Sequence, residues 1–358
     1  MPPSSGVLKR LQKAELSDCR RACTFLQSDF WGAFKGRFGW QALAFEAEWD
    51  DGEGGTSRTP LLVLCRSLGF GFSLAYVPWG PQLPDFFPSD EAVRGEALKD
   101  LAFAVKSHLS PDTAFIRFDP PWYTEGKDSL PPPIPSPFVR SSADIQAPDT
   151  VLIDLTPPLD DILAQMKSKW RYNARLALKK GVTVRRALPE EIGVFYDLLK
   201  ETARRDGIAI HGSEYYQTLL ANKAEENGID VRLYLAEHEG DVLAGIVTLF
   251  RGFEAVYMYG ASSDKKRSLM SPYALQVKAL EDAKASGCGQ YDLFGIPPNA
   301  DPAHPMAGLY LFKTGFGGRI IHRPGSWDFP CRPLPYRLFR LAERVRKNLR
   351  TLKKKSRR

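Results

Sequence analysis

The order of the elements expected between residues 149 and 296 constrains the fold of this chain more than any other feature. An apolar strand, DTVLIDLT, leads into a helical stretch with prolines near its start and Gly181 at its end. A strand, VTVRRA, and two helices, over about 190–206 and 213–227, follow. Three strands joined by the turns HEGD and RGFE then form a meander, and the helix SPYALQVKALEDAKASG precedes a last strand, QYDLFGI. This half of the chain is therefore predicted to be a mixed α/β domain.

The first half can be read as a weaker copy of that order, without a repeat in the sequence itself. The segment from QALAFEAEW to FSLAYVPWG predicts an antiparallel meander, and a helix with Asp90 as its cap follows. The strand TAFIRFDPPW comes next, and the proline-rich LPPPIPSPF is expected to be a loop. Since 358 residues exceed the usual size of one hydrophobic core, two domains are expected. The predicted fold class is α+β (mixed α/β), with two GNAT-like (acyl-CoA N-acyltransferase-like) domains.

The charge of the chain is concentrated at its end. The last thirteen residues, RKNLRTLKKKSRR, hold eight Lys or Arg and no acid, while the whole chain carries +7. The rest is therefore nearly neutral, and attraction to anions is expected from the tail and from local patches. Five cysteines without paired spacing and five histidines favour neither a disulfide framework nor a metal site. Without a signal peptide or a long apolar run, a cytoplasmic protein is expected.

One helix carries a basic stripe. Lys167, Arg171, Arg175 and Lys179 are spaced by four, so they share a helix face, next to a face with Ile162, Met166, Trp170 and Ala177. The stripe is either a solvated surface or a contact for phosphates.

The segment GLYLFKTGFGGRI is the most suggestive stretch for chemistry. Lys313 lies between Phe312 and Phe316 and is followed by glycines that permit close backbone approach. By pattern alone this is either a glycine-rich hairpin with an exposed Lys or a site where Lys313 stabilises an oxyanion.

Two further positions bear on chemistry. Asp119 stands at a strand end before two prolines, as a turn residue or a cleft residue. Tyr257 and Tyr259 are expected on the same side of a strand, in the core or on a binding wall. No glycine lies between Ala261 and Leu275, where acetyl-CoA-dependent GNAT enzymes cradle the pyrophosphate, so the acyl donor is not expected to be a CoA thioester.

The chain from Leu338 onward shows apolar residues at helical spacing with Arg and Lys on the other face. A basic amphipathic end of this kind suits an anionic membrane surface. A solvated terminal helix with a disordered basic end, or a contact with tRNA, are the other interpretations.

Six segments in a fixed order cover residues 25–318: FLQSDFWGAFKGRFGW, FIRFDPPW, LIDLTPPLDDILAQMKSKWRYNARLALKKGVTV, VYMYGASSDKKRSLMSPYALQ, YDLFGIPP and GLYLFKTGFGG. Together they resemble the FemABX family, the non-ribosomal peptidyltransferases that build peptidoglycan interpeptide bridges. The resemblance implies two GNAT-like domains around a cleft in the compact, FemX-like form, with domain 1 over 1–152, completed by about 320–345. Domain 2 would span 153–319, and 346–358 would be a basic tail.

The resemblance also implies a function in cell wall biogenesis and cell shape. The chain would be an aminoacyltransferase (EC 2.3.2 type) that uses aminoacyl-tRNA as co-substrate, without a cofactor or metal. Its acceptor would be the side-chain amine of the stem peptide in lipid II or UDP-MurNAc-pentapeptide. We expect a monomer in the cytoplasm, with possible peripheral contact to the inner face of the plasma membrane through the basic tail.

Site residues follow from the same resemblance. Lys313 and Phe312 would meet the tRNA acceptor end, with Lys313 and Asp119 as the catalytic pair. The residues implied in precursor binding are Lys35, His211, Tyr215, Tyr257 and Tyr259. At His211 the family often has Arg, and a neutral imidazole is a poorer phosphate partner than a guanidinium.

Two other functions remain open from the sequence. One is a GNAT-type N-acyltransferase that acts on another amine, against which the missing glycine-rich turn counts. The other is a tRNA- or membrane-binding module with a decayed site, against which the segment FKTGFGG counts.

Overall fold

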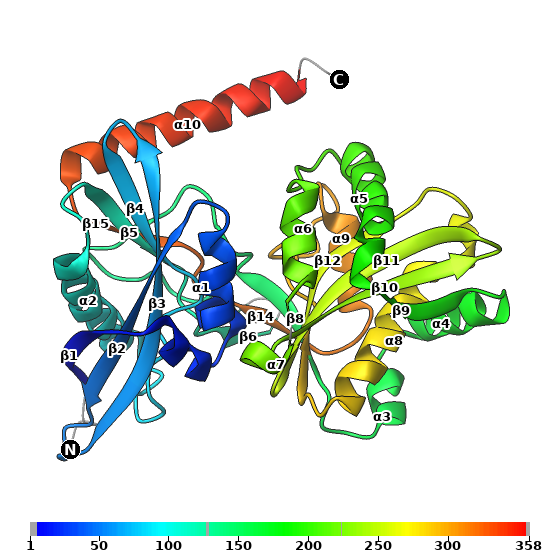
Figure 1. Ribbon diagram of the computed structural model, residues 1–358, viewed down its shortest axis with the longest axis horizontal. Helices are drawn as coiled ribbons and strands as arrows, with labels where there is room; N and C mark the ends of the chain where they lie inside the picture. The colour runs from blue at the N-terminus through cyan, green and yellow to red at the C-terminus, as the bar shows by residue number, and fades with distance from the viewer. Residues whose placement is uncertain (1–5, 127–128, 223, 356–358) are drawn as a thin grey trace. The chain divides into compact units, whose positions relative to one another are not determined.

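The computed structural model describes residues 6–126, 129–222 and 224–355, with side chains described up to residue 345. The chain divides into two compact units. Unit 1 comprises the described residues of Met1–Thr124, Leu130–Pro148 and Arg323–Arg358, and unit 2 those of Glu125–Ser129 and Asp149–His322. Each unit combines a sheet with helices (Figure 1), as the predicted mixed α/β class requires.

Unit 1 is built on one mixed sheet. Its strands are β1 (Val7–Ala14), β2 (Gln41–Asp50), β3 (Thr56–Gly69), β4 (Phe72–Val77), β5 (Thr113–Phe118), β7 (Val139–Arg140) and β15 (Trp327–Pro330). In the part of the chain that the structure describes, they pair in the order β1-β2-β3-β4-β5-β15-β7. The predicted antiparallel meander is confirmed as β2, β3 and β4, while β4 and β5 are parallel. The late strand β15 lies between β5 and β7, so the end of the chain returns to this sheet.

The helices of unit 1 cover this sheet. They are the 3-10 helices η1 (Leu16–Arg21) and η2 (Phe25–Gln27), and α1 (Asp29–Gly36), α2 (Glu91–His108) and α10 (Pro333–Lys355). The predicted cap of α2 is confirmed, because the carboxylate of Asp90 accepts hydrogen bonds from the backbone N–H groups of Ala92 and Val93. Leu98, Leu101 and other apolar residues of α2 pack into the core of this unit.

Unit 2 is built on a second sheet. Its strands are β6 (Thr124–Glu125), β8 (Asp149–Asp154), β9 (Thr183–Ala187), β10 (Asp230–His238), β11 (Asp241–Arg251), β12 (Glu254–Ser262), β13 (Gln290–Asp292) and β14 (Arg319–His322). Within the described residues the order is β6-β14-β8-β13-β12-β11-β10-β9. The predicted meander is confirmed as β10, β11 and β12, and β13 joins β12 in parallel.

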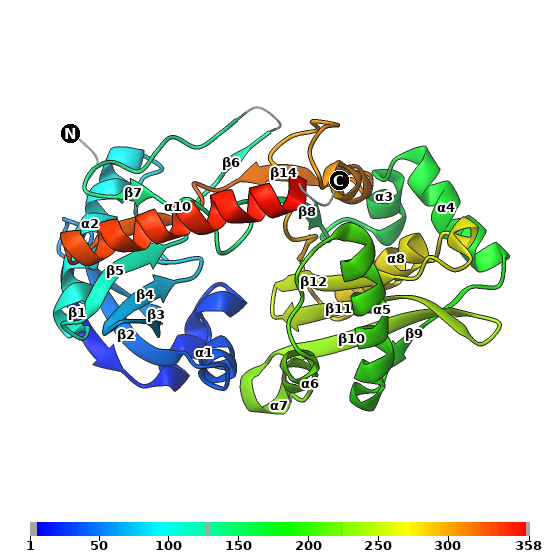
Figure 2. The same cartoon turned by 90° about the horizontal axis from the view of Figure 1, so that it is seen from above.

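The helices of unit 2 lie on both faces of its sheet. They are α3 (Leu159–Ala164), α4 (Ser168–Lys179), α5 (Ile192–Asp206), α6 (Ser213–Leu220), α7 (Ala224–Asn227), α8 (Ser271–Ala285) and α9 (Ala307–Thr314), with the 3-10 helices η3 (Pro189–Glu191) and η4 (Arg267–Leu269). The helices α4 and α8 pack together over one face, and α5 and α6 cover the other (Figure 2). Apolar side chains of α3, α4, α8 and α9 fill the core between the first pair and the sheet.

The prediction of a single helix between the prolines at 157–158 and Gly181 is wrong. The structure has two helices in this segment, α3 and α4. Lys167 is extended, with φ −55° and ψ 141°, and its N–H donates to the carbonyl of Gly315. The guanidinium of Arg171 donates to the carbonyls of Ala164 and Met166, which the break leaves without helical partners. A tertiary hydrogen bond and one side chain thus interrupt a pattern that is continuous in the sequence.

The helix predicted over 213–227 is also divided, into α6 and α7. The side chains of Asn222 and Asn227 bond each other, and Asn222 also donates to the carbonyl of Ile229. These local bonds compete with helix continuation, as Asn side chains commonly do.

The predicted terminal helix is confirmed as α10, which begins at Pro333. The side chains of the predicted tail, 346–358, lie outside the described residues. Among the helices that the structure describes, none has both the length and the apolar character needed to cross a bilayer.

Candidate active site

Lys313 lies on α9, buried to 6% exposure. Its Nζ atom donates to the carbonyl oxygens of Phe294 and Gly295, at 3.0 Å each. These carbonyls belong to the loop after β13, where Phe294 has a left-handed φ of 58°. The amine is therefore aimed at a bend of the backbone instead of at solvent.

The glycine-rich hairpin with an exposed Lys, expected from pattern alone, is wrong. The residues before Gly315 form a helix because Tyr310 and Phe316 are buried in the core of unit 2. The glycines act afterwards: Gly317 and Gly318 have positive φ, and a Cβ on Gly318 would lie 2.4 Å from the carbonyl oxygen of Leu152. The glycines thus turn the chain from α9 into β14.

Burial determines the electrostatics of Lys313. Loss of solvent lowers the pKa of its amine to about 7, against which the carboxylate of Asp292 acts. That carboxylate accepts bonds from the hydroxyl of Thr150 (2.5 Å) and the N–H of Phe294 (2.7 Å). Its Oδ2 atom is buried and has no hydrogen-bond partner among the described residues. Burial and the neighbouring Asp292 therefore act in opposite directions on the pKa of Lys313, and burial has the larger effect.

One aromatic ring lies close to this amine, and an aromatic cluster packs around the neighbouring Phe312. The Nζ atom lies 5.0 Å from the ring centre of Tyr257, a cation–π distance. The indole of Trp170 donates to the carbonyl of Phe312 at 2.8 Å, which ties α4 to α9. Tyr273 packs edge-on against Phe312 and Trp170, with ring centres 5.4 and 5.7 Å apart. The structure therefore brings together Lys313, Phe312 and Tyr257 from the predicted site.

Tyr257 and Tyr259 lie on opposite faces of the sheet, so the prediction of a shared face is wrong. The register between β11 and β12 shifts at this point: Val247 faces Tyr259, while Thr248 faces Tyr257. Met258 is thus an extra residue, a β-bulge, which breaks the alternation of two. Tyr257 packs with the core under α8, whereas Tyr259 meets tyrosines of α6.

The second group of predicted residues gathers on that other face. The ring of His211 stacks on Tyr215 with centres 3.9 Å apart and planes 12° from parallel. The hydroxyl of Tyr259 donates to that of Tyr215 at 3.4 Å, and burial raises the pKa of Tyr215 to about 12. The tyrosines therefore stay neutral and hold the exposed imidazole flat against a buried ring.

Lys35 lies in unit 1, at the end of α1. Its Nζ atom is 5.5 Å from the ring centre of Trp31 and 5.6 Å from that of Trp40. The guanidinium of Arg66 lies over Trp40 as well, at 5.4 Å. Burial, and then the charge of Arg66, lower the pKa of Lys35. Two cations that share one indole form a local site for an anion.

Asp119 follows β5 in the same unit and is buried to 3% exposure. Its carboxylate accepts hydrogen bonds from the hydroxyls of Tyr76 (2.5 Å) and Ser326 and from the N–H of Gln146 (3.3 Å). Burial raises its pKa to about 6, although these bonds favour the charged form. The geometry makes Asp119 a residue that positions Tyr76, and its catalytic role stays a prediction.

The sequence reasoning missed several residues around these groups. Trp40 lies between Lys35 and Asp119 of unit 1. Its ring centre is also 6.1 Å from that of Tyr76, whose hydroxyl donates to Asp119. Trp40 lies five residues after Lys35, and Trp170 lies within the basic run. A tryptophan close to cationic residues in the sequence could have pointed to both positions. Asp292 stands in the segment YDLFGIPP, but nothing in the sequence marks its role beside Lys313, and nothing marks Arg66.

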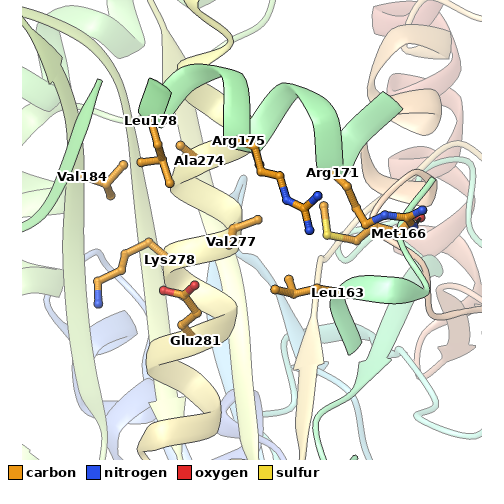
Figure 3. Close-up of a pocket in the computed structure, with 11 residues that line it drawn as sticks. Leu163, Met166, Arg171, Arg175, Leu178, Val184, Ala274, Val277, Lys278 and Glu281 are labelled. Carbon is orange, nitrogen blue, oxygen red and sulfur yellow. Dashed lines mark hydrogen bonds between the residues drawn. The ribbon is translucent and has the colours of Figure 1, made fainter. Parts of the chain in front are cut away.

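A cavity of about 270 Å³ lies beside α4 and α8 (Figure 3). Arg175 extends over it from α4, and Glu281 rises from α8 on another wall. Burial raises the pKa of Glu281. Of the predicted basic stripe, Arg171 is thus bonded to backbone and Arg175 borders the cavity, while phosphate binding by the stripe stays a prediction. The apolar walls include Leu163, Met166, Leu178, Val184, Ala274 and Val277.

The turn before α8 lacks the glycines of a pyrophosphate cradle. Lys266 and Met270 take left-handed conformations there, with φ 47° and 58°. The Lys266 amine is held by Asp241 and Glu239 at 3.1 and 3.2 Å. Among the described residues no group of three or more His, Cys, Asp or Glu is arranged to hold a metal ion.

Comparison with known proteins places these features in context. The model of the FemAB family matches residues 137–237 and 230–344. A lipid II:glycine glycyltransferase of Staphylococcus epidermidis is 25% identical over 264 residues, which cover 57% of this chain and 63% of the relative. A protein of the same name from Staphylococcus aureus is 24% identical over 269 residues, with the same coverage. The match thus spans less than two thirds of these relatives.

The crystal structure of FemX superposes on this chain with a TM-score of 0.74 at 19% identity, over 92% of this chain and 100% of FemX. That likeness confirms the predicted fold of two GNAT-like domains. The family model covers more than half of the sequence, and the resemblance drawn from the six segments is confirmed. The chain belongs to the FemAB family.

Proposed function

We propose that this protein transfers an amino acid from aminoacyl-tRNA to the side-chain amine of a peptidoglycan stem peptide, building the interpeptide bridge. Membership of the FemAB family and the glycyltransferase activity for which the staphylococcal relatives are named support this class of reaction. The observation that carries the proposal is the buried Lys313, whose pKa of about 7 suits it to act on developing charge at neutral pH.

The chemistry needs no cofactor, because the ester is already activated. The neutral amine attacks the ester carbonyl, a C–N bond forms, and the C–O bond to the tRNA ribose breaks. One proton leaves the amine, and one proton reaches the ribose oxygen, so the products are an amide and a free hydroxyl. The protein has to position the two substrates and stabilise the tetrahedral oxyanion.

Lys313 supplies the charge for that oxyanion. An ammonium group has three N–H donors, and within the described chain two of them are used on the carbonyls of Phe294 and Gly295. The third is left for the substrate, held in direction by the other two. Phe312 and Trp170 offer flat rings beside it for the acceptor-end base.

Lys35 and Arg66 are proposed to bind the diphosphate of the precursor, since they are two cations over one indole. The stacked His211 and Tyr215 offer a second contact, weaker toward phosphate than the Arg that the family resemblance implies at this position. Both lipid II and UDP-MurNAc-pentapeptide carry the group that these residues would recognise.

The test is incubation of the purified chain with a panel of charged tRNAs and each precursor, followed by mass spectrometry. A fixed mass increment on the precursor, absent with uncharged tRNA and with Lys313→Met, supports the proposal and names the amino acid. No increment with any charged tRNA, together with acetyl-group transfer from acetyl-CoA to an amine, would replace it with a GNAT-type acyltransferase.

A further inference from the structure

The helix α10 has an inner face that is bonded to unit 1. Tyr336 is buried, and its hydroxyl donates to the carboxylate of Asp328 at 3.1 Å. Phe339 packs on Phe115 with ring centres 4.8 Å apart. The carboxylate of Glu343 accepts from the hydroxyl of Ser142 at 2.5 Å. These side chains, at positions i, i+3 and i+7, fix which way the helix faces.

The opposite face of α10 carries an apolar row, hereafter the outer row. It consists of Leu334, Leu338, Leu341 and Val345, which are 68, 55, 59 and 49% exposed. Steps of four, three and four residues keep these side chains within a narrow stripe. Because the stripe lies about half a turn from Tyr336 and Glu343, it points away from the rest of unit 1. Single exposed leucines are ordinary, but an aligned row on an outward helix face indicates a binding surface.

Positive charge accompanies the outer row. Arg337 and Arg344 are exposed beside it, and the acidic Glu343 is turned inward. From residue 333 to the end, the sequence holds eleven Lys or Arg and one acid. The same spacing continues in the sequence at Leu349 and Leu352, whose side chains lie outside the described residues.

We propose that α10 lies in the plane of an anionic membrane surface, with the outer row inserted at the boundary of headgroups and acyl chains. Long Arg side chains can keep their charge at the headgroups while the leucines enter hydrocarbon. Each cation near an anionic surface adds about 1 kcal/mol of attraction. RNA would use the cations but leave the outer row in water, so the lipid surface satisfies both features. This proposal does not rest on the transfer reaction.

The test is co-flotation of the full chain with vesicles, without tRNA or precursor. One vesicle type is phosphatidylcholine alone, and the other is an equal mixture with phosphatidylglycerol. The variant is Leu338→Gln/Leu341→Gln, and the control is Phe70→Gln/Leu188→Gln, which removes two apolar side chains that are 100 and 66% exposed elsewhere. Equal melting temperatures of the three proteins verify that the substitutions leave the fold intact.

Binding to the anionic vesicles is expected for the wild type and the control, with weak binding to phosphatidylcholine. The outer-row variant should bind roughly tenfold or more weakly, since it lacks two leucine side chains that the wild type would insert into the membrane. Recovery of the variant equal to that of the wild type would overturn the proposal. Self-association in ultracentrifugation, or tRNA binding, that depends on the outer row while vesicle binding does not would overturn it too. Because no substrate is present, these outcomes are independent of whether amino acid transfer is observed.

Discussion

The Nζ atom of Lys313 lies 5.0 Å from the ring centre of Tyr257, on the α8 face of the unit 2 sheet. Tyr257 is itself partly buried against the core of unit 2, and loss of solvent raises the pKa of its hydroxyl to about 12. The ring therefore meets the amine as a neutral aromatic face and cannot neutralise its charge as a phenolate would. The positive charge of the Lys313 amine is therefore not neutralised by Tyr257 and, in the proposed reaction, is available to the substrate.

Replacement of Lys313 by Met should remove a pH dependence of stability. The pKa of this Lys falls from 10.5 to about 7 on folding, so between these values the unfolded chain binds the extra proton. Wild-type stability, relative to Lys313→Met, should therefore rise by about 3 to 4 kcal/mol from about pH 7 to about pH 10. Urea unfolding of both proteins across this range measures the difference, and parallel curves would contradict the burial of the amine.

Lys313→Met should also lower turnover by about 10²- to 10³-fold while precursor affinity changes little. A matched control is Lys284→Met, since Lys284 likewise donates to backbone carbonyls, those of Leu155, Thr156 and Pro157. Single-turnover transfer and equilibrium binding separate the two effects. Equal losses for both lysines would mean that the effect is structural.

The pH profile of transfer should report the same amine. Deprotonation of the acceptor amine raises the rate with pH, but loss of the Lys313 charge should flatten the rise above about pH 7. Lys313→Arg keeps its charge at all these pH values, so its slower rate should go on rising. A wild-type rate that rises without a break to about pH 9 would exclude a charged Lys313 from the rate-limiting step.

Lys35→Ala should weaken precursor binding by about tenfold and leave the rate at saturating precursor nearly unchanged. Arg66→Ala should do the same, because both cations lie over Trp40. Arg37, exposed one residue after α1, gives the control variant Arg37→Ala. Titration calorimetry with UDP-MurNAc-pentapeptide distinguishes them, and equal affinity of all three variants would remove the diphosphate assignment.

Asp119→Asn should act on stability more than on turnover. The pKa of Asp119 rises from 3.8 to about 6 on folding, so the folded chain binds the extra proton and wild-type stability should fall as pH rises through this window. The Asn variant should lack that fall and keep most of its turnover where it is folded. Loss of turnover at unchanged stability would restore Asp119 to a catalytic role.

Much of the fold could be predicted because hydrophobic alternation and helical spacing are local. The meanders β2–β4 and β10–β12, and the cap at Asp90, follow from neighbouring residues. The break between α3 and α4 could not be predicted, because it depends on a bond from Lys167 to Gly315, far along the chain.

The candidate site divides in the same way. Lys313 and Phe312 stand in a recognisable segment, but the helical form of that segment depends on burial of Tyr310 and Phe316 against distant strands. Asp292 and Arg66 could not be identified, since each becomes relevant only through folding next to Lys313 or Trp40. Sequence spacing locates a reactive side chain, and its electrostatic neighbours come from tertiary contacts.

The bulge at Met258 separates two sets of constraints on β12. Because of this extra residue, Tyr257 contacts the amine of Lys313, and Tyr259 contacts Tyr215, on which His211 stacks, on the other face of the sheet. A substitution at one tyrosine can therefore change the contacts on its own face of the sheet without disturbing those of the other. Deletion of Met258 would make Tyr257 and Tyr259 neighbours in a regularly alternating strand, so the two rings would stay on opposite faces and both sets of contacts should survive the shorter strand.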